Sequence, residues 1–406
     1  MTKKSTIENT SLPAGWEIKK LGEVSETIMG QAPPGKECNR EGLGYPFVKT
    51  GQFGEIYPKI NEWTTKPLKK VCEGDVLITV VGATIGKLNL GVSCAIGRSV
   101  AGIRVKEGVV DHLFLYNYLF LWVEKLRKIS TGAAITVISK KTIFDIPFPL
   151  PPLPQQKQIV AILDKAFAAI DTAKVNAEQN LQNAKELFES YLQNVFENKG
   201  GDWVTSTIGE SCNLMTGGTP SRSKKEYFDN GTINWLVSGD INKKEINDCE
   251  GKITELGFEN SNTKFLPLNS VMIALNGQGK TRGTVAMLRI KATCNQSLVS
   301  IYPKDDSSLL PELIYANLEG RYNEIRKITG DSGNDRRGLN MPLIRKISFS
   351  YPTSIDEQKV IIGQLASLKS QTNKLEAIYT QKLADLEEMK KSILQKAFSG
   401  QLNTIN

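Results

Sequence analysis

One stretch of 41 residues occurs twice in this chain, and this duplication limits the possible folds more than any other feature. Residues 156–196 return as residues 358–398 without a gap, and eleven of the 41 aligned pairs are identical. The repeat period of 202 positions is about half of the 406-residue chain. It therefore indicates the duplication of a large unit rather than a solenoid of short repeats.

Each copy of the stretch predicts a long amphipathic helix. Apolar residues recur at alternating steps of three and four, which is the spacing of a heptad seam. A helix of about 40 residues would be ~60 Å long at ~1.5 Å per residue. The polar residues Asn180 and Lys382 occupy matching positions in the two seams. The apolar seam residues are Leu163, Ile170, Ala173, Ala184 and Leu187 in the first copy, and Leu365, Leu368, Leu375, Leu386 and Met389 in the second.

The segments that precede the two helices echo each other more faintly and in the same order. Strands are expected at residues 76–82 and 100–105, which are β-branched runs bounded by glycines, and a helix at 113–129. Prolines between residues 147 and 154 mark a stiff boundary, because proline disrupts a helix interior. The expected organisation is a mixed α/β globule at 1–154, a helix at 155–200, a second globule at 201–355 and a helix at 356–406. This predicts an α+β protein built as an internal repeat.

The composition is that of a globular protein with more than one domain. The chain has 406 residues, of which 40% are hydrophobic and 23% are charged. Its longest apolar runs are too short for a membrane helix, and its N-terminus lacks the apolar core of a signal peptide. We therefore expect a cytoplasmic protein.

The net charge of +8 is concentrated in the two globules. Residues 1–154 hold 20 basic and 14 acidic residues, and residues 201–355 hold 19 basic and 17 acidic residues. The two repeated segments are nearly neutral. Modestly basic globules suit a polyanionic partner, although many basic proteins bind none.

Basic residues on glycine-rich or polar loops are the best candidates for DNA contacts. Loops on a rigid scaffold commonly carry recognition residues. Arginine and lysine can bind phosphates or guanine, and glutamine can pair with adenine. Each loop alone is equally compatible with ordinary solvated surface. The candidates are Lys49, Gln52, Thr84, Lys87, Arg98, Lys140 and Lys141 in the first globule, and Arg222, Lys224, Lys225, Lys280, Arg282, Arg336 and Arg337 in the second.

No pattern in the sequence predicts catalysis. Residues 274–281 loosely match a phosphate-binding loop, but a strand-like segment follows them where a helix would be needed. The Asn/Asp-Pro-Pro-Tyr/Phe motif of adenine methyltransferases is absent. The six cysteines form no CxxC pair and His112 is the only histidine, so we expect free thiols and no metal site.

The layout resembles the specificity subunits of type I restriction–modification enzymes, the HsdS family. The resemblance rests on PLPPLPQQKQIVAILDKA at 149–166 and its partner YPTSIDEQKVIIGQLASL at 351–368. KSILQKAFSGQL at 391–402 and TGGTPSRSKKEYFDNGTINWLVSGDI at 216–241 also match segments typical of the family. Together these segments extend the resemblance over essentially the whole chain.

The resemblance implies a fold and a set of partners. Each globule would be a target recognition domain that reads one half of a bipartite, asymmetric DNA site. The two helices would form an antiparallel coiled coil with a pseudo-two-fold axis, set the spacer and dock two methyltransferase subunits. Two ATP-dependent restriction subunits would complete a bacterial defence complex against foreign DNA. S-adenosylmethionine, ATP and Mg²⁺ would belong to these partners, and this chain would carry no cofactor.

Two alternative functions fit parts of the sequence. A coiled-coil adaptor with protein-binding globules would explain the helices without DNA. A stand-alone ATPase would rest only on the weak phosphate-loop match. Binding to random DNA pools separates the first alternative from a specificity subunit, and an ATP-turnover assay of the lone chain tests the second.

Overall fold

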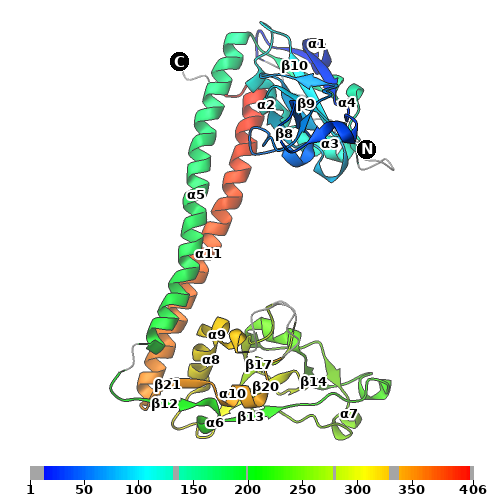
Figure 1. Ribbon diagram of the computed structural model, residues 1–406. Coiled ribbons are helices and arrows are strands. Elements are labelled where there is room, and N and C mark those ends of the chain that lie inside the picture. Colours follow the sequence, from blue (N-terminus) through cyan, green and yellow to red (C-terminus); the bar gives the residue numbers. More distant parts are fainter. Residues whose placement is uncertain (1–12, 131–136, 198–199, 278–279, 329–337, 403–406) are drawn as a thin grey trace. The chain divides into compact units, whose positions relative to one another are not determined.

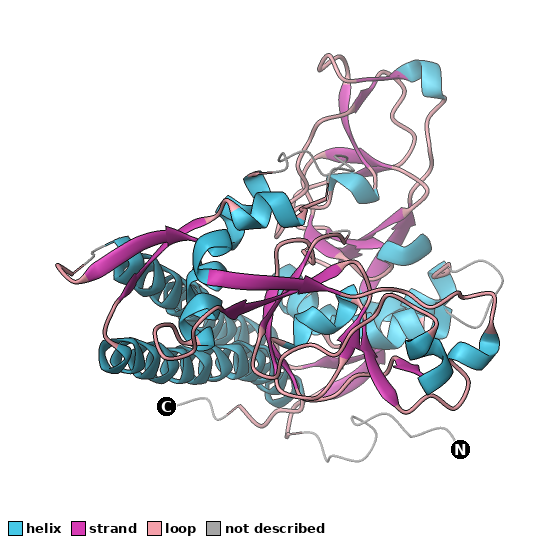
Figure 2. Ribbon diagram, turned by 90° about the horizontal axis from the view of Figure 1, so that it is seen from below, coloured by secondary structure: helices cyan, strands magenta, loops and turns pink. Residues whose placement is uncertain are grey.

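The computed structural model describes residues 13–130, 137–197, 200–277, 280–328 and 338–402. These residues divide into two compact units. Unit 1 consists of residues 1–178 and 381–406, and unit 2 consists of residues 179–380. Each unit therefore contains one mixed α/β globule and parts of both long helices (Figures 1 and 2).

The globule of unit 1 is built around a four-stranded sheet with the order β2-β10-β7-β8 and a five-stranded sheet with the order β3-β5-β4-β9-β6. Strands β1 and β11 form a separate antiparallel pair. The strands are β1 Glu17–Lys20, β2 Ser25–Met29, β3 Cys38–Asn39, β4 Tyr45–Val48, β5 Trp63–Thr64, β6 Lys70–Val71, β7 Val76–Thr79, β8 Leu88–Leu90, β9 Cys94–Ile96, β10 Val100–Val105 and β11 Pro147–Leu150. The helices are α1 Leu21–Val24, η1 Gly35–Glu37, η2 Thr50–Gln52, η3 Gly82–Thr84, α2 His112–Phe120, α3 Val123–Ser130 and α4 Lys140–Phe144.

The two expected strands are confirmed, and the expected helix is divided. Strands β7 and β10 begin at residues 76 and 100, and all four residues of β7 are buried. The helix expected at 113–129 is split into α2 and α3 at Leu121 and Trp122. Asp111 caps the first piece, because its side chain accepts hydrogen bonds from the backbone N–H groups of Leu113 and Phe114.

The globule of unit 2 repeats this plan. Its main sheet has the order β13-β20-β17-β18-β15, beside a three-stranded sheet β16-β14-β19 and the pair β12-β21. The strands are β12 Trp203–Thr207, β13 Cys212–Thr216, β14 Ile233–Leu236, β15 Glu245–Ile246, β16 Lys252–Ile253, β17 Val271–Ala274, β18 Val285–Leu288, β19 Thr293–Cys294, β20 Leu298–Pro303 and β21 Ser348–Pro352. The helices are α6 Ile208–Ser211, η4 Lys225–Tyr227, η5 Ser238–Lys243, α7 Glu255–Glu259, α8 Pro311–Gly320, α9 Tyr322–Lys327 and α10 Met341–Arg345.

The two long helices are α5, Leu153–Glu197, and α11, Ile355–Phe398. They run antiparallel inside each unit. In unit 1, Lys174 pairs with Glu387 at 2.8 Å and Asp171 pairs with Lys390 at 3.8 Å. In unit 2, the Tyr191 hydroxyl bonds the side chain of Gln364 at 3.1 Å. Helix α5 starts two residues earlier than expected, with Pro154 in its first turn, where proline is tolerated.

A buried glutamine attaches the start of α5 to the globule of unit 1. The side chain of Gln156 is fully buried. Its amide nitrogen donates to the carbonyl oxygens of Val109 and Pro151 at 2.9 and 2.8 Å. Its amide oxygen accepts from the backbone N–H of Asp111 at 2.8 Å. One buried side chain therefore satisfies three backbone groups.

The same arrangement recurs at the start of α11 in unit 2. Gln358 is also fully buried. Its amide nitrogen donates to the carbonyl oxygens of Ser308 and Pro352 at 2.9 and 2.8 Å, and its amide oxygen accepts from the N–H of Leu310 at 2.9 Å. We call Gln156 and Gln358 the anchor glutamines.

A tryptophan reinforces each anchor. The indole N–H of Trp16 donates to the side chain of Gln155 at 3.1 Å, and that of Trp203 donates to Glu357 at 3.0 Å. Each acceptor is the residue directly before an anchor glutamine. Trp16 directly precedes β1 and Trp203 is the first residue of β12, so both strands are tied to the helix starts.

The far end of α11 returns to the globule of unit 1. Phe398 is 1% exposed, and its ring lies 4.9 Å from Phe114 and 5.1 Å from Tyr118 between centroids. The matching residue of the first copy, Phe196, is only half-buried, and its ring centroid lies 6.3 Å from that of Trp203. The C-terminal part of α11 is thus part of the core of unit 1.

The predicted seam is buried over much of both helices. Leu163, Ile170, Ala184, Leu365 and Leu386 are all at most 9% exposed, and Ala173 and Leu368 are half-buried.

Three seam predictions and both polar positions need correction. Leu187, Leu375 and Met389 are 50%, 37% and 51% exposed, and Asn180 and Lys382 are exposed as well. In each case the following residue is less exposed; these residues are Leu181, Phe188, Glu376, Leu383 and Lys390. A straight helix has 3.6 residues per turn, so its buried stripe drifts toward later positions than a 3.5-residue repeat predicts.

Replacing an anchor glutamine by methionine should destabilise its own unit. Gln156→Met removes the partners of three backbone groups that face a fully buried side chain, and each group left unpaired there costs about 1–3 kcal/mol. We expect a loss of roughly 3 kcal/mol or more, measured by calorimetric unfolding of the whole chain. The matched control is Gln182→Met on the exposed face of α5, which should change stability by less than about 0.5 kcal/mol. Equal effects of the two substitutions would contradict the anchor role.

Candidate nucleic-acid interface

In unit 1, three loops meet at the C-terminal end of strand β7. The N–H of Val80 donates to the carbonyl oxygen of Ser99 at 2.9 Å, and the carbonyl of Val80 accepts from the N–H of Ile138 at 2.8 Å. The carbonyl of Thr79 accepts from the N–H of Gly86 at 2.9 Å. The backbone groups of Thr79, the last residue of β7, and of Val80 therefore form hydrogen bonds to all three loops. They comprise residues 80–87, 97–99 and 137–141.

In unit 2, the same hydrogen bonds recur at the end of β17. The N–H of Leu275 donates to the carbonyl oxygen of Ser297, and the carbonyl of Leu275 accepts from Leu339, each at 2.9 Å. The carbonyl of Ala274 accepts from the N–H of Gly283 at 2.9 Å. The described parts of these loops are residues 275–277 with 280–284, 295–297 and 338–340. We call the three loops the loop cluster of each unit.

The end of the neighbouring strand joins each loop cluster. In unit 1, the carbonyl of Val48, the last residue of β4, accepts from the N–H of Gly97 at 2.9 Å. In unit 2, the carbonyl of Leu236, the last residue of β14, accepts from Asn295 at 3.0 Å. The segment after β4, which carries Lys49 and Gln52, therefore borders the loop cluster.

Four basic candidates of unit 1 lie exposed in its loop cluster: Lys87, Arg98, Lys140 and Lys141. Ser139 places the last two in the first turn of α4, because its hydroxyl accepts a hydrogen bond from the N–H of Thr142 at 3.1 Å. In unit 2, Lys280 is exposed in the corresponding loop, and its carbonyl accepts a 2.7 Å hydrogen bond from the Tyr322 hydroxyl. The fold thus gathers basic residues that are far apart in sequence.

The polar groups of Lys49 and Gln52 contact other residues of unit 1. The Lys49 ammonium pairs with Glu62 at 2.5 Å and lies 5.6 Å from the ring of Phe47. Gln52 is 7% exposed; its side chain accepts from the N–H of Lys49 at 2.9 Å and donates to Asn61 at 2.8 Å. These bonds hold the loop after β4 in shape.

Thr84 and Arg282 are also partly or largely buried. The carbonyl of Thr84 accepts a hydrogen bond from the Thr79 hydroxyl at 2.5 Å inside the β7–β8 loop. Arg282 is 9% exposed and directly precedes Gly283. In unit 1 the position before Gly86 is Ile85, which is 1% exposed. Arg282 therefore occupies the place of a core residue.

The remaining candidates of unit 2 lie on a different segment or outside the described residues. Arg222, Lys224 and Lys225 are exposed at and before η4, which packs near α7. The Lys224 ammonium donates to the Tyr227 hydroxyl at 3.0 Å, and this hydrogen bond raises the pKa of Lys224. Arg336 and Arg337 lie outside the described residues. The assignment of individual DNA contacts stays a prediction.

The turn at 295–297 was absent from the sequence-based candidates. Its backbone hydrogen bonds match those of the turn at 97–99. The turn at 97–99 contains the charged residue Arg98, whereas the turn at 295–297 contains no charged residue. The signal available was the shared serine, Ser99 or Ser297, directly before an apolar strand. A search for basic loops overlooks this turn, because none of its three residues is charged.

Side chains suited to metal binding do not gather in the parts of the chain that the structure describes. No group of three His, Cys, Asp or Glu residues could hold a metal ion there. Burial raises the pKa of Cys94, Cys212 and Cys294 to about 12, so these thiols stay protonated at neutral pH. Among the described helices, none combines the length and apolar character that a membrane span needs.

Two mixed α/β globules with equivalent loop clusters, each anchored to one of two long helices, define a duplicated two-module protein. The family model for the type I restriction modification DNA specificity domain matches residues 13–183 and again residues 200–387. The chain therefore belongs to this family, which confirms the predicted family and the fold class. Relatives that match over nearly the whole of this chain are named specificity subunits of type I restriction enzymes.

Curated relatives carry matching names. A putative type I restriction enzyme MjaX specificity subunit from Methanocaldococcus jannaschii is 38% identical over 194 residues, which are 47% of this chain and 45% of that protein. The EcoR124I/EcoR124II specificity subunit of Escherichia coli is 29% identical over 65% of this chain and 66% of its own length. The MjaVIII specificity subunit from Methanocaldococcus jannaschii is 24% identical and covers 97% of this chain and 95% of its own length.

Solved structures share the fold. A chain from a study of complex assembly and conformational transition of the type I R-M system superposes with a TM-score of 0.79, at 17% identity, over 97% of this chain and all of the other. The HsdS subunit from Thermoanaerobacter tengcongensis gives a TM-score of 0.63, at 17% identity, over 98% of this chain and 100% of its own. At these identities the likeness concerns the fold alone.

The glycines at the equivalent positions of the two loop clusters should differ in their tolerance to alanine. Gly86 and Gly283 have φ of 84° and 82°, a left-handed conformation that costs an L-residue about 1–2 kcal/mol. A Cβ on Gly86 would also lie 2.9 Å from Val123, whereas the nearest atom to a Cβ on Gly283 is 3.5 Å away. We expect Gly86→Ala to lower the unfolding temperature more than Gly283→Ala.

Gly51→Ala provides the control for this comparison, because its Cβ would enter open space and its φ lies outside the left-handed region. Differential scanning calorimetry of the three variants ranks them directly. A smaller effect at Gly86 than at Gly283 would rule out the role of Val123.

Proposed function

We propose that this chain is the DNA-binding specificity subunit of a type I restriction–modification complex and reads a bipartite, asymmetric site. Each globule would read one half-site through its loop cluster. The observation that supports this most directly is the repetition of one backbone hydrogen-bond network around two sets of loops with different side chains. A common scaffold with divergent loops suits two related readers with different targets.

The exposed basic residues of the loop clusters suit binding to the DNA backbone. Lysine and arginine contacts to phosphates position a protein on the duplex, while base-edge contacts supply specificity. Lys87, Lys140 and Lys141 are exposed and close to loops with polar side chains. Because the side chains of the two loop clusters differ, the two half-sites are expected to differ as well.

The two long helices would set the spacer and dock the catalytic partners. Their duplicated surfaces suit two copies of one partner. In unit 2, Lys369 lies 5.5 Å from the ring of Phe188, and in unit 1, Lys390 lies 4.8 Å from the ring of Phe167. Each pair joins a lysine of α11 to a phenylalanine of α5. The helix pair therefore presents similar features in both units.

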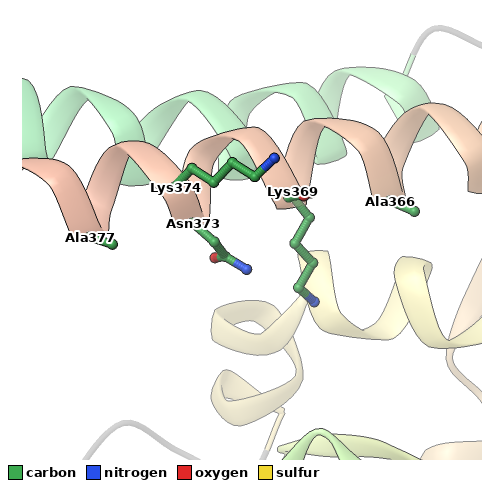
Figure 3. A pocket seen from close by; sticks show the side chains of 6 residues that line it. Ala366, Lys369, Asn373, Lys374 and Ala377 are labelled. Carbon is green, nitrogen blue, oxygen red and sulfur yellow. The ribbon is translucent and has the colours of Figure 1, made fainter.

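The surface of α11 in unit 2 carries polar side chains around Lys369, beside the exposed apolar residues Leu375 and Ile378. Lys369 points from α11 toward α8 and bonds Glu319 at 3.0 Å, while Asn373 and Lys374 are exposed (Figure 3). A surface that mixes polar and exposed apolar side chains suits a partner in a multi-subunit assembly. The proposed partners are two methyltransferase subunits, which would bring S-adenosylmethionine, and two restriction subunits, which would bring ATP and Mg²⁺, in the cytoplasm of a bacterium.

Selection from a random pool of double-stranded DNA tests the proposal. The chain, purified together with the methyltransferase subunit encoded beside it, should enrich one motif of two different half-sites separated by a fixed gap. Absence of an enriched motif, together with stable capture of a protein ligand by the globules, would favour the adaptor alternative instead.

Removing charge from the loop cluster should weaken DNA binding without changing the motif. The double variant Lys140→Gln, Lys141→Gln should lower affinity for all sequences and reduce the slope of log affinity against log salt by about one for each phosphate that the variant no longer binds. Fluorescence anisotropy over a salt series measures both quantities. Lys106→Gln, at the other end of β10 from Ser99, is the control and should leave the slope unchanged.

Shortening both helices by one heptad should change the gap between half-sites and leave the bases unchanged. The deletions 174–180 in α5 and 381–387 in α11 are matched, because Lys174 pairs with Glu387. Seven residues correspond to ~10 Å of helix, or about three base pairs. Methylome sequencing of cells that express the variant complex reads the motif. A change of bases at constant gap would refute the spacer role.

A further inference from the structure

One turn occupies the same place in both loop clusters and presents a single side chain outward. In unit 1 the turn is Gly97–Val100, closed by a hydrogen bond from the N–H of Val100 to the carbonyl of Gly97 at 2.9 Å. In unit 2 it is Asn295–Leu298, closed by the bond from Leu298 to Asn295 at 3.4 Å. We call these the reading turns.

Both reading turns are held by strand ends on two sides. The first residue of each turn donates to the end of β4 or β14, and the third residue accepts from the residue that follows β7 or β17. In unit 1 these bonds are Gly97 to Val48 and Val80 to Ser99, both at 2.9 Å. The equivalent bonds of unit 2 are 3.0 and 2.9 Å long. The second residue of each turn takes part in neither of these bonds.

The residue before each turn and the last residue of the turn are buried in the core. Ile96 and Val100 in unit 1, and Cys294 and Leu298 in unit 2, are all 0% exposed. The two projecting residues, Arg98 and Gln296, are both exposed. The backbone of a rigid, core-anchored turn loses little conformational freedom on binding, which favours the use of such a turn in recognition.

Arg98 keeps its donors available. Its guanidinium forms no hydrogen bond or ion pair with any residue inside the described ranges. An arginine can bind the O6 and N7 atoms of guanine with two parallel hydrogen bonds in the major groove. Among side chains in proteins, this is the pairing that most commonly specifies guanine.

The side-chain amide of Gln296 has the donor and acceptor that pair with an adenine edge. Its amide oxygen accepts a hydrogen bond from the Thr219 hydroxyl at 2.6 Å, which orients the amide. That oxygen has a second lone pair, and the amide nitrogen keeps its two donors. A glutamine in this state can accept from N6 and donate to N7 of adenine.

We propose that Arg98 and Gln296 are equivalent specificity residues, with Arg98 reading a guanine in one half-site and Gln296 reading an adenine at the corresponding position of the other. This inference rests on the proposed function and adds the identity of one base in each half-site. An ordinary solvated arginine or a phosphate contact would leave the recognised sequence unchanged, so base reading has a distinct signature.

The test compares the motifs selected by the wild-type chain and its variants, each purified with the methyltransferase subunit and given a pool of double-stranded DNA with a randomised central region. Arg98→Gln should lower the preference for guanine at one position of one half-site by about tenfold to a hundredfold. Gln296→Arg should shift one position of the other half-site from adenine toward guanine. All other positions should keep their preferences.

Arg98→Lys and Lys87→Gln complete the design. Arg98→Lys keeps the charge but loses the two-bond geometry, so it should weaken the same guanine preference to a smaller degree and supports the proposal even if Arg98→Gln fails to assemble. Lys87→Gln removes a charge from the same loop cluster and should lower affinity equally for all sequences.

The outcomes separate this inference from the proposed function. A wild-type chain that selects no motif overturns the proposed function and the inference together. A wild-type motif that the Arg98 and Gln296 variants reproduce at every position, with or without a uniform loss of affinity, overturns the inference alone.

Discussion

The architecture depends on one neutral side chain that is used twice. Each anchor glutamine bonds three backbone groups from two segments, and an amide can do this without placing a charge in the core. The bond from Gln156 to the N–H of Asp111 also positions the residue that caps α2. The start of a long helix, the chain directly before that helix and the residues that lead into α2 or α8 are thus joined at one side chain in each unit. The loop clusters lie on the same globules that these bonds attach to the long helices.

The two units show how a duplicated frame can carry different surfaces. Backbone hydrogen bonds around the loop clusters match one by one, while the side chains at matching positions do not. Ile85 in unit 1 corresponds to Arg282 in unit 2, and Arg98 corresponds to Gln296. Backbone bonds depend little on side-chain identity, so the side chains of these loops can differ while the scaffold stays the same. Substitution of the projecting residues leaves the hydrogen-bonded ends of the strands intact.

The repeat, the long helices and the family were all predictable from the sequence, because heptad spacing and a gap-free duplication are strong signals. The seam was correct at Leu163 and Ile170 and wrong at Leu187 and Met389, where the 3.6-residue helix had drifted away from the strict pattern. The grouping of basic loops at the strand ends could not be read from the chain, since it depends on pairings between distant segments. The internal use of Gln52 follows from tertiary contacts that no local pattern encodes.

The division of both long helices between the units has a consequence for biosynthesis. Unit 2 consists of one continuous segment, residues 179–380, whereas unit 1 needs residues 381–402 in addition to its N-terminal part. A growing chain can therefore complete unit 2 before Phe398 reaches the aromatic cluster formed by Phe114 and Tyr118. The globule of unit 1 is therefore synthesised first but completed last. Until Phe398 packs against it, its aromatic cluster lacks one of its rings. A translation product that stops before Phe398 would lack that ring permanently, which marks it as a substrate for chaperones and proteases.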